Sequence, residues 1–225
     1  SMADPKLSKA VISLAFHPSG EFLAASYDIP AVEGFEQPIV LWDTSTGLRV
    51  DPPFVGHRFE VTSLAFAPDG KHLVSGSWDN DVRLWATDTR QIIPPILVEA
   101  ARGEAELWER RGPTGVAVSP DGKTLVSVMS NELAMWDIAS HKVLWRLSGI
   151  INATTLALSR NGKLAGIGGE SKNFVLISTD FKHWLRAACQ LAPRRLTVAE
   201  TRYYLGESAD RHMATEDPCL EFVDN

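Results

Sequence analysis

The chain has 225 residues, of which 44% are hydrophobic and 22% are charged, proportions that suit a globular protein with a real core. Its formal net charge of −6 argues against binding to nucleic acid or to an anionic membrane, because both need a basic face. No apolar run reaches the roughly 18–20 residues that span a bilayer. With only two cysteines, Cys189 and Cys219, we expect a cytoplasmic protein without disulfides.

One pattern occurs four times along the chain: a short, alternating apolar segment that ends in a turn of the Pro-Asp-Gly type. Such a turn has a physical basis, since proline presets φ, Asp or Asn closes a local hydrogen bond and glycine accepts a positive φ. The four copies are residues 11–20, 61–70, 115–122 and 155–162. Each apolar segment is predicted to be the first strand of a repeating unit.

Further strands are predicted after each turn. The second strands are expected at residues 22–26, 72–77, 124–128 and 163–167, and the third strands at residues 39–42, 82–85, 133–136 and 174–177. Fourth strands are expected near residues 48–54, 91–97 and 142–147. Four strands per unit are typical of the blades of a β-propeller, which we place at residues 10–57, 58–111, 112–150 and 151–180.

Several motifs in residues 10–180 resemble the WD-repeat propellers: Trp42-Asp43, Trp136-Asp137, Gly56-His57 and the run from Ser75 to Asp79. The second unit departs from the family pattern with Trp85-Ala86, and the fourth reads Ile177-Ser178 in place of Trp-Asp. The resemblance implies an all-β fold of WD-type blades.

The same resemblance implies that four side chains form a hydrogen-bonded structural tetrad inside the second blade: His57, Ser75, Asp79 and Trp85. Chemistry supports such a chain, because a buried Asp must be paired, a His can donate to it and an indole N–H needs an acceptor. A Ser–His–Asp set also occurs in hydrolases. Ser75, however, lies inside a predicted strand and lacks a strained, glycine-flanked elbow, so we expect no catalytic residue here.

The fourth unit contains only three predicted strands, and residues 1–9 make a poor strand because Pro5 interrupts them. The family resemblance implies six to eight blades, whereas about four are present. We therefore expect either the C-terminal part of a larger propeller or a half-ring that a homodimer completes, since open blades would expose apolar faces and edges. A four-bladed monomer is the alternative.

Residues 181–225 are predicted to form a short helical tail. Trp184, Leu185, Ala188 and Leu191 share one face of a first helix that Pro193 ends. The tail resembles the segment after the last repeat in bacterial WD-repeat signalling ATPases of the NACHT or STAND type; the matching features are Trp184-Leu185, Ala188-Cys189, Arg195-Leu196-Thr197, Glu200, Tyr204-Leu205 and Cys219. The resemblance implies a nucleotide-binding switch upstream. This chain has no Walker motif, so we expect no cofactor.

Two insertions, residues 28–38 and 99–113, interrupt the otherwise short connections and are expected on one face. Long loops on one face of a repeat array often form its binding surface. The candidate partner-binding residues are Glu33, Phe35, Glu36, Leu107, Trp108, Arg110 and Arg111. The alternative for Trp108 is that it folds back over the blade core. The six histidines show no metal-site spacing, so no metal is expected.

These features predict a non-catalytic interaction and sensing module whose partner is a protein or peptide. The tail resemblance implies that it is the ligand-recognition end of a bacterial signalling ATPase. Two alternatives stay open. An enzyme with a site in the central channel would need acid and base groups at the ends of the inner strands. These ends lack any acid/base pair; they read Phe16-His17, Phe66-Ala67, Val118-Ser119 and Leu158-Ser159. A purely structural half-ring would serve assembly alone.

Overall fold

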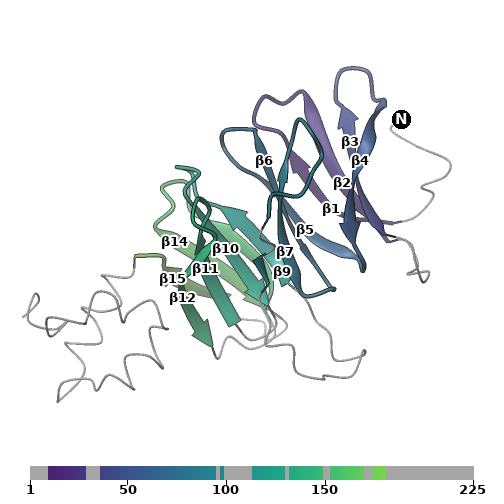
Figure 1. Ribbon diagram of the computed structural model, residues 1–225. Coiled ribbons are helices and arrows are strands. Elements are labelled where there is room, and N and C mark those ends of the chain that lie inside the picture. The colour runs from purple at the N-terminus through teal and green to yellow at the C-terminus, as the bar shows by residue number, and fades with distance from the viewer. Residues whose placement is uncertain are drawn as a thin grey trace, which may run out of the picture.

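The protein is described here by a computed structural model, which covers residues 10–28, 36–94, 97–98, 113–129, 132–148, 153–169 and 174–180. Every regular element in these ranges is a β-strand, and the strands form four antiparallel sheets that follow one another in chain order (Figure 1). The predicted all-β architecture is confirmed. The predicted helical tail, residues 181–225, lies outside the described residues.

Each sheet is a simple meander. The first contains β1 (Val11–Phe16), β2 (Phe22–Tyr27), β3 (Gln37–Asp43) and β4 (Arg49–His57), and the second β5 (Val61–Phe66), β6 (His72–Ser77), β7 (Asp81–Ala86) and β8 (Leu97–Val98). The third contains β9 (Pro113–Val118), β10 (Thr124–Met129), β11 (Glu132–Asp137) and β12 (Lys142–Ser148), and the fourth β13 (Ala153–Leu158), β14 (Leu164–Gly169) and β15 (Phe174–Ser178). Within the described residues β15 is therefore the outer edge of a three-stranded sheet, as the sequence predicts.

The four sheets stand side by side like blades, with their first strands adjacent. β1 neighbours β5, β5 neighbours β9 and β9 neighbours β13, so the first and fourth sheets lie at opposite ends of the row (Figure 1). We call the side of the β1–β2 and β3–β4 type connections the turn face. The opposite side, with the β2–β3 and β4–β5 type connections, is the loop face.

The turns after the first strands share one geometry, which explains the repeated glycine. Gly20, Gly70, Gly122 and Gly162 have φ values of 76°, 69°, 71° and 70°. This is the left-handed region in which a side chain is disfavoured. Each of these glycines donates its N–H to the carbonyl three residues earlier, over 2.8–2.9 Å.

The Trp-Asp motif has a structural reason in the turns after β3 and β11. Trp42 and Trp136 are buried, whereas the following Asp43 and Asp137 stand at the strand ends. Asp43 Oδ1 accepts hydrogen bonds from the hydroxyls and N–H groups of Ser45 and Thr46, and these bonds lower the pKa of Asp43 to about 2. The motif thus pairs a core residue with a turn cap.

Most of the core consists of apolar layers between adjacent blades; a further buried cluster, made of Ala25, Tyr27, Val40 and Trp42, belongs to the first sheet alone. Between the first and second sheets the fully or nearly fully buried members include Ile39, Leu41, Phe54, Leu64, Leu73 and Trp85. Between the second and third they include Val74, Val82, Leu84, Val116, Leu125 and Trp136. Between the third and fourth they include Val126, Leu133, Met135, Ala153, Ile167 and Ile177. Each blade is therefore stabilised by its neighbours as well as by its own strands.

The fourth strand predicted near residues 91–97 does pair with β7, but its pairing is interrupted. Ile92 makes an isolated bridge to Trp85, and regular pairing resumes only at β8, where Val98 faces Asp81. An unbroken ladder from the Ile92 bridge would place residue 96 opposite Asp81, so the register has shifted by two residues. Pro94 and Pro95 explain the break, because proline has no N–H to donate to a ladder.

Candidate functional site

The four residues of the expected tetrad form one continuous hydrogen-bonded chain. His57 Nδ1 lies 2.9 Å from Asp79 Oδ2, His57 Nε2 lies 2.7 Å from Ser75 Oγ, and Trp85 Nε1 donates to Ser75 Oγ over 2.7 Å. An indole N–H can only donate, so Ser75 accepts from Trp85 and donates its own hydrogen to His57 Nε2. This network assigns the His57 proton to Nδ1, from which it is donated to Asp79.

The tetrad is enclosed by the blade. His57, Ser75 and Trp85 are 0% exposed and Asp79 is 8% exposed. Burial lowers the pKa of His57 below its ordinary value, and the hydrogen bond to Asp79 opposes this effect only in part. Burial by itself would raise the pKa of Asp79, but hydrogen bonds from His57 and the Arg58 N–H, with the charge of Arg83, hold it below its ordinary value. At neutral pH a neutral imidazole therefore faces a carboxylate.

Asp79 also joins two connections of the loop face. Its Oδ2 accepts from the N–H of Arg58, directly after β4, over 3.0 Å, and its Oδ1 accepts from the N–H of Asp81, at the start of β7, over 3.1 Å. The carboxylate is thus occupied on both oxygens. Ser75 is buried between His57 and Trp85, so its hydroxyl does not reach the surface.

The other two tryptophans at this strand position find different acceptors. Trp136 Nε1 donates to Ser127 Oγ over 3.0 Å, and Trp42 Nε1 donates to the hydroxyl of Tyr27 over 2.9 Å. Sequence reasoning missed both pairs. Ser127 stands two residues after Leu125 as Ser75 does after Leu73, so alignment of the second strands could have found it. Tyr27 has no such counterpart in the other blades.

The candidate partner-binding residues fall mostly outside the described ranges. Only Glu36 is described; it is exposed and immediately precedes β3 on the loop face. The remaining candidates lie in the parts that the structure leaves undescribed: Glu33, Phe35, Leu107, Trp108, Arg110 and Arg111. The structure therefore does not bring this set together.

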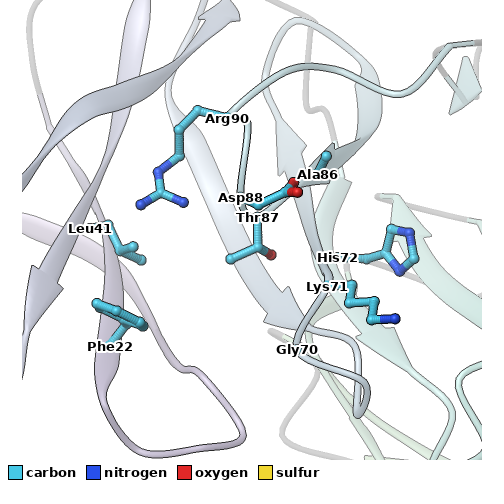
Figure 2. Close-up of a pocket in the computed structure, with 9 residues that line it drawn as sticks. All are labelled: Phe22, Leu41, Gly70, Lys71, His72, Ala86, Thr87, Asp88 and Arg90. Carbon is cyan, nitrogen blue, oxygen red and sulfur yellow. The ribbon is translucent and has the colours of Figure 1, made fainter.

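A pocket of about 660 Å³ opens between the first and second sheets on the turn face (Figure 2). Phe22 and Leu41 of the first sheet form one wall. The second sheet supplies the other wall from residues 70–72, in the β5–β6 turn, and residues 86–88 and 90, after β7. Sequence reasoning, which placed the binding surface on the loop face, did not predict this pocket.

A second pocket, of about 500 Å³, repeats this arrangement between the second and third sheets. Its lining residues stand at the equivalent positions: His72 replaces Phe22, Lys123 replaces Lys71, and His141 replaces Arg90. Arg90 and His141 even share a left-handed backbone, with φ values of 62° and 57°. The pockets are thus a repeating product of blade packing, but their chemistry differs because Thr87 and Asp88 give way to Ile138 and Ala139.

The first pocket contains two polar groups without a hydrogen-bond partner among the described residues, Thr87 Oγ1 and Arg90 Nε. The equivalent threonine of the first blade, Thr44, donates to the carbonyl of Gly20 over 2.7 Å. In the second blade that carbonyl, of Gly70, is taken by His17 Nε2 from the first blade, at 3.0 Å. Arg90 extends toward Leu41 in Figure 2, and its guanidinium lies 5.1 Å from the centre of the Phe54 ring.

No group of three or more His, Cys, Asp or Glu residues in the described ranges is placed to hold a metal ion. None of the described segments forms a helix with the length and hydropathy needed to cross a membrane.

Comparisons with known proteins agree with the blade architecture. The WD40 family, described as "WD domain, G-beta repeat", matches residues 6–28 and 50–86. The chain is 33% identical over 128 residues to the Periodic tryptophan protein 2 homolog of Neurospora crassa, a match that covers 56% of this chain and 12% of that protein. It is 27% identical over 169 residues to a Guanine nucleotide-binding protein subunit beta of Oryza sativa subsp. japonica, covering 72% of this chain and 42% of the relative.

A solved structure shows the same fold. A chain of "Kuenenia stuttgartiensis Hydrazine Synthase" superposes with a TM-score of 0.61 at 17% identity, over 75% of this chain and 46% of that chain. At this identity the match concerns the fold alone. The chain spans only 12–42% of the two relatives named above. Together the matches support a WD-repeat propeller.

Proposed function

We propose that this row of WD-type blades is a protein-interaction module that binds a partner protein or peptide and catalyses no reaction. One contrast carries the proposal. The serine–histidine–aspartate set is sealed in the core, whereas the polar groups of Lys71, Asp88 and Arg90 line an open groove between blades. The relatives named as beta subunits of guanine nucleotide-binding proteins are, by that name, parts of larger assemblies.

The first proposed contact surface is the loop face, through Glu33, Phe35, Glu36, Leu107, Trp108, Arg110 and Arg111. The argument for it is that long insertions collect there while the other connections are short. The groove of Figure 2 supplies a second surface, on the turn face. Its Arg90 guanidinium and Lys71 ammonium would favour an acidic side chain of the partner.

Selection from a random-peptide phage library against the immobilised chain tests binding and separates the two surfaces. One variant replaces residues 99–113 by a Gly-Ser linker of equal length. A second carries Arg90→Glu, and Lys123→Glu in the neighbouring groove is its matched control. We expect the selection to yield peptides that bind the parent chain and the Lys123→Glu variant but do not bind the chain whose residues 99–113 are replaced. Loss at Arg90→Glu alone would move the binding surface to the groove, and no enrichment over blank matrix would contradict the proposal.

The hydrolase interpretation of the Ser75, His57 and Asp79 set is tested at Ser75. Because Ser75 is fully buried between His57 and Trp85, we expect a fluorophosphonate probe to leave Ser75 of the folded protein unlabelled. The measurement is peptide mass spectrometry after labelling, with a serine hydrolase as the positive control. Labelling at Ser75 would overturn the non-catalytic proposal.

We further propose that the natural protein is a bacterial signalling ATPase of the NACHT or STAND type, with this chain as its ligand-recognition end in the cytoplasm. The support is the tail resemblance, from Trp184-Leu185 to Cys219, which lies outside the described residues. The full-length reading frame decides the matter. A Walker motif upstream is the expected finding, and an upstream region without any nucleotide-binding motif would contradict it.

A further inference from the structure

Neighbouring blades are joined by a repeating side-chain to backbone hydrogen bond. Ser13 Oγ accepts from the N–H of Leu64 over 3.1 Å, and Ser63 Oγ accepts from the N–H of Val116 over 3.0 Å. Ser13 and Ser63 are the third residues of β1 and β5, and Leu64 and Val116 are the fourth residues of the next inner strands. The first and second blades thus each present a hydroxyl to the backbone of the blade that follows.

The two ends of the row carry the two halves of this same junction. Leu14 is the fourth residue of β1, so its backbone stands where Leu64 and Val116 stand in their blades. Thr155 is the third residue of β13 and places a hydroxyl where Ser13 and Ser63 place theirs; its side chain is exposed. One end therefore offers the donor side and the other end the acceptor side.

The apolar side chains of β1 are exposed where their counterparts in β5 are more deeply buried, although Val40 and Trp42 of the same sheet are themselves buried. We call Val11, Leu14 and Phe16 the leading flank. Leu14 is 55% exposed but its counterpart Leu64 only 7%, and Val11 is 50% exposed against 1% for Val61. The difference arises because β5 has a preceding blade beside it and β1 has none within the described residues.

The opposite end shows the same contrast. We call Thr155, Phe174 and Leu176 the trailing flank. Phe174 is 74% exposed while its counterpart Val82 is 0%, and Leu176 is 61% exposed while Leu84 is 3%. Val82 and Leu84 are buried because the third sheet packs on them. Patches of this kind on a protein surface mark places where another surface binds.

We infer that the leading flank of one copy of this chain binds the trailing flank of a second copy. The second copy is identified by self-complementarity. β1 reads Val-Ile-Ser-Leu-Ala-Phe, which differs at one position from the Val-Thr-Ser-Leu-Ala-Phe of β5. Within the chain, β5 already packs on the blade that precedes it. Neither flank carries a charge that would repel its partner. Two copies joined head to tail make two identical junctions and close a ring, with Leu14 N–H donating to Thr155 Oγ1 across each.

This assembly goes beyond the proposed function, because binding a peptide needs no second copy. Sedimentation velocity of the 225-residue chain at micromolar concentration tests it. We expect twice the chain mass of 24.7 kDa for the parent. Leu14→Glu and Leu176→Glu should each give the monomer mass, since a buried charge would replace an apolar contact. Leu48→Glu is the matched control, because Leu48 is also exposed but lies outside both flanks.

Mixing separates specific pairing from general stickiness. Leu14→Glu keeps an intact trailing flank and Leu176→Glu an intact leading flank, so an equimolar mixture should recover a weaker dimer through one intact junction. Thr155→Val should raise the dimer Kd by about two- to tenfold, and Thr155→Ser should not. A parent chain that stays monomeric at every concentration would overturn the inference, as would equal dissociation of the Leu48 control. Circular dichroism verifies that each variant is folded.

Discussion

Two histidine–aspartate pairs in this protein have the same separation and different surroundings. His57 Nδ1 to Asp79 Oδ2 and His72 Nδ1 to Asp69 Oδ2 both measure 2.9 Å. The first pair is 0% and 1% exposed at its side chains, and the second 31% and 43%. Water can replace either partner of the exposed pair, whereas a buried donor left alone has no substitute. Residues with equal geometry therefore differ in what they contribute to stability.

Asp79→Ala is expected to lower the free energy of unfolding by about 1–3 kcal/mol, because His57 Nδ1 and the Arg58 N–H lose their acceptor. Asp69→Ala, the matched control on the surface, should lower it by less, because water can replace the bonds of Asp69 to the Lys71 N–H and to His72. Urea denaturation of both variants beside the parent measures the difference. Equal midpoints for the two variants would contradict the stabilising role of the tetrad.

The His57 environment also predicts a pH dependence. Its folded pKa lies below the ordinary 6.5, so near that pH the unfolded chain binds a proton that the folded protein does not. Stability should therefore fall as the pH drops below about 6.5. Asp79, whose folded pKa is also lowered, adds a further loss only below about pH 4, as its carboxylate protonates.

The check is the free energy of unfolding of the parent and of His57→Gln at several pH values between about 7.5 and 5. The parent curve should decline over this window and the variant curve should be flatter. The variant will be less stable overall, so the slopes are compared and not the absolute values. Parallel slopes would mean that His57 does not titrate on unfolding in this range.

At the scale of the sheets, the junctions between blades are alike in plan but not in chemistry. The first two use Ser13 and Ser63. The third has Gly115 at that position, and there the strands approach closely: a Cβ on Gly115 would lie 2.8 Å from Leu156 Cβ and 3.2 Å from Leu156 N. The glycine thus replaces a hydrogen bond by close packing of β9 on β13.

Gly115→Ala should destabilise the protein by about 1–3 kcal/mol, because the added methyl group would push β9 away from β13. Gly166→Ala is the matched control, also within a strand; its Cβ would have its nearest neighbour, Leu176 Cδ2, at an ordinary 3.6 Å. We expect the control to be neutral or stabilising by up to about 1 kcal/mol. The denaturation midpoints of the two variants test this prediction. A Gly115→Ala variant as stable as the parent would show that β9 and β13 can accommodate the added methyl group without cost.

The blades form a row that exposes apolar side chains of β1 at one end and of β15 at the other, at positions whose counterparts are more deeply buried at the interior junctions. The free energy of unfolding should then depend on whether a second copy packs on those ends. Association that covers them contributes only in the folded state, so it raises the unfolding temperature by mass action.

We expect the Tm of the parent chain to rise with protein concentration across the micromolar range, and the Tm of Leu14→Glu to be independent of it. Differential scanning calorimetry at several concentrations measures both. The Leu48→Glu variant should follow the parent. A concentration-independent Tm for the parent would show that its ends are not covered by a second copy.

Much of this protein follows from local pattern. Alternating strands, Pro-Asp-Gly turns and the Trp-Asp pairs predicted the order of strands in each blade, since period-two alternation and positive-φ glycines act within a few residues. The motif residues His57, Ser75, Asp79 and Trp85 were expected together from the family pattern, and the structure places them in hydrogen-bond contact. The loop-face candidates around Trp108 lie outside the described residues and stay a prediction.

The contacts between blades, by contrast, are set by tertiary packing and not by local sequence pattern. Ser13 meets Leu64, and His17 takes the carbonyl of Gly70 that Thr87 would otherwise use, across separations of 51 and 53 residues. The interrupted fourth strand of the second blade and the pocket beside Arg90 also depend on tertiary packing. No periodicity within a strand encodes them, because they depend on how one finished sheet packs on the next.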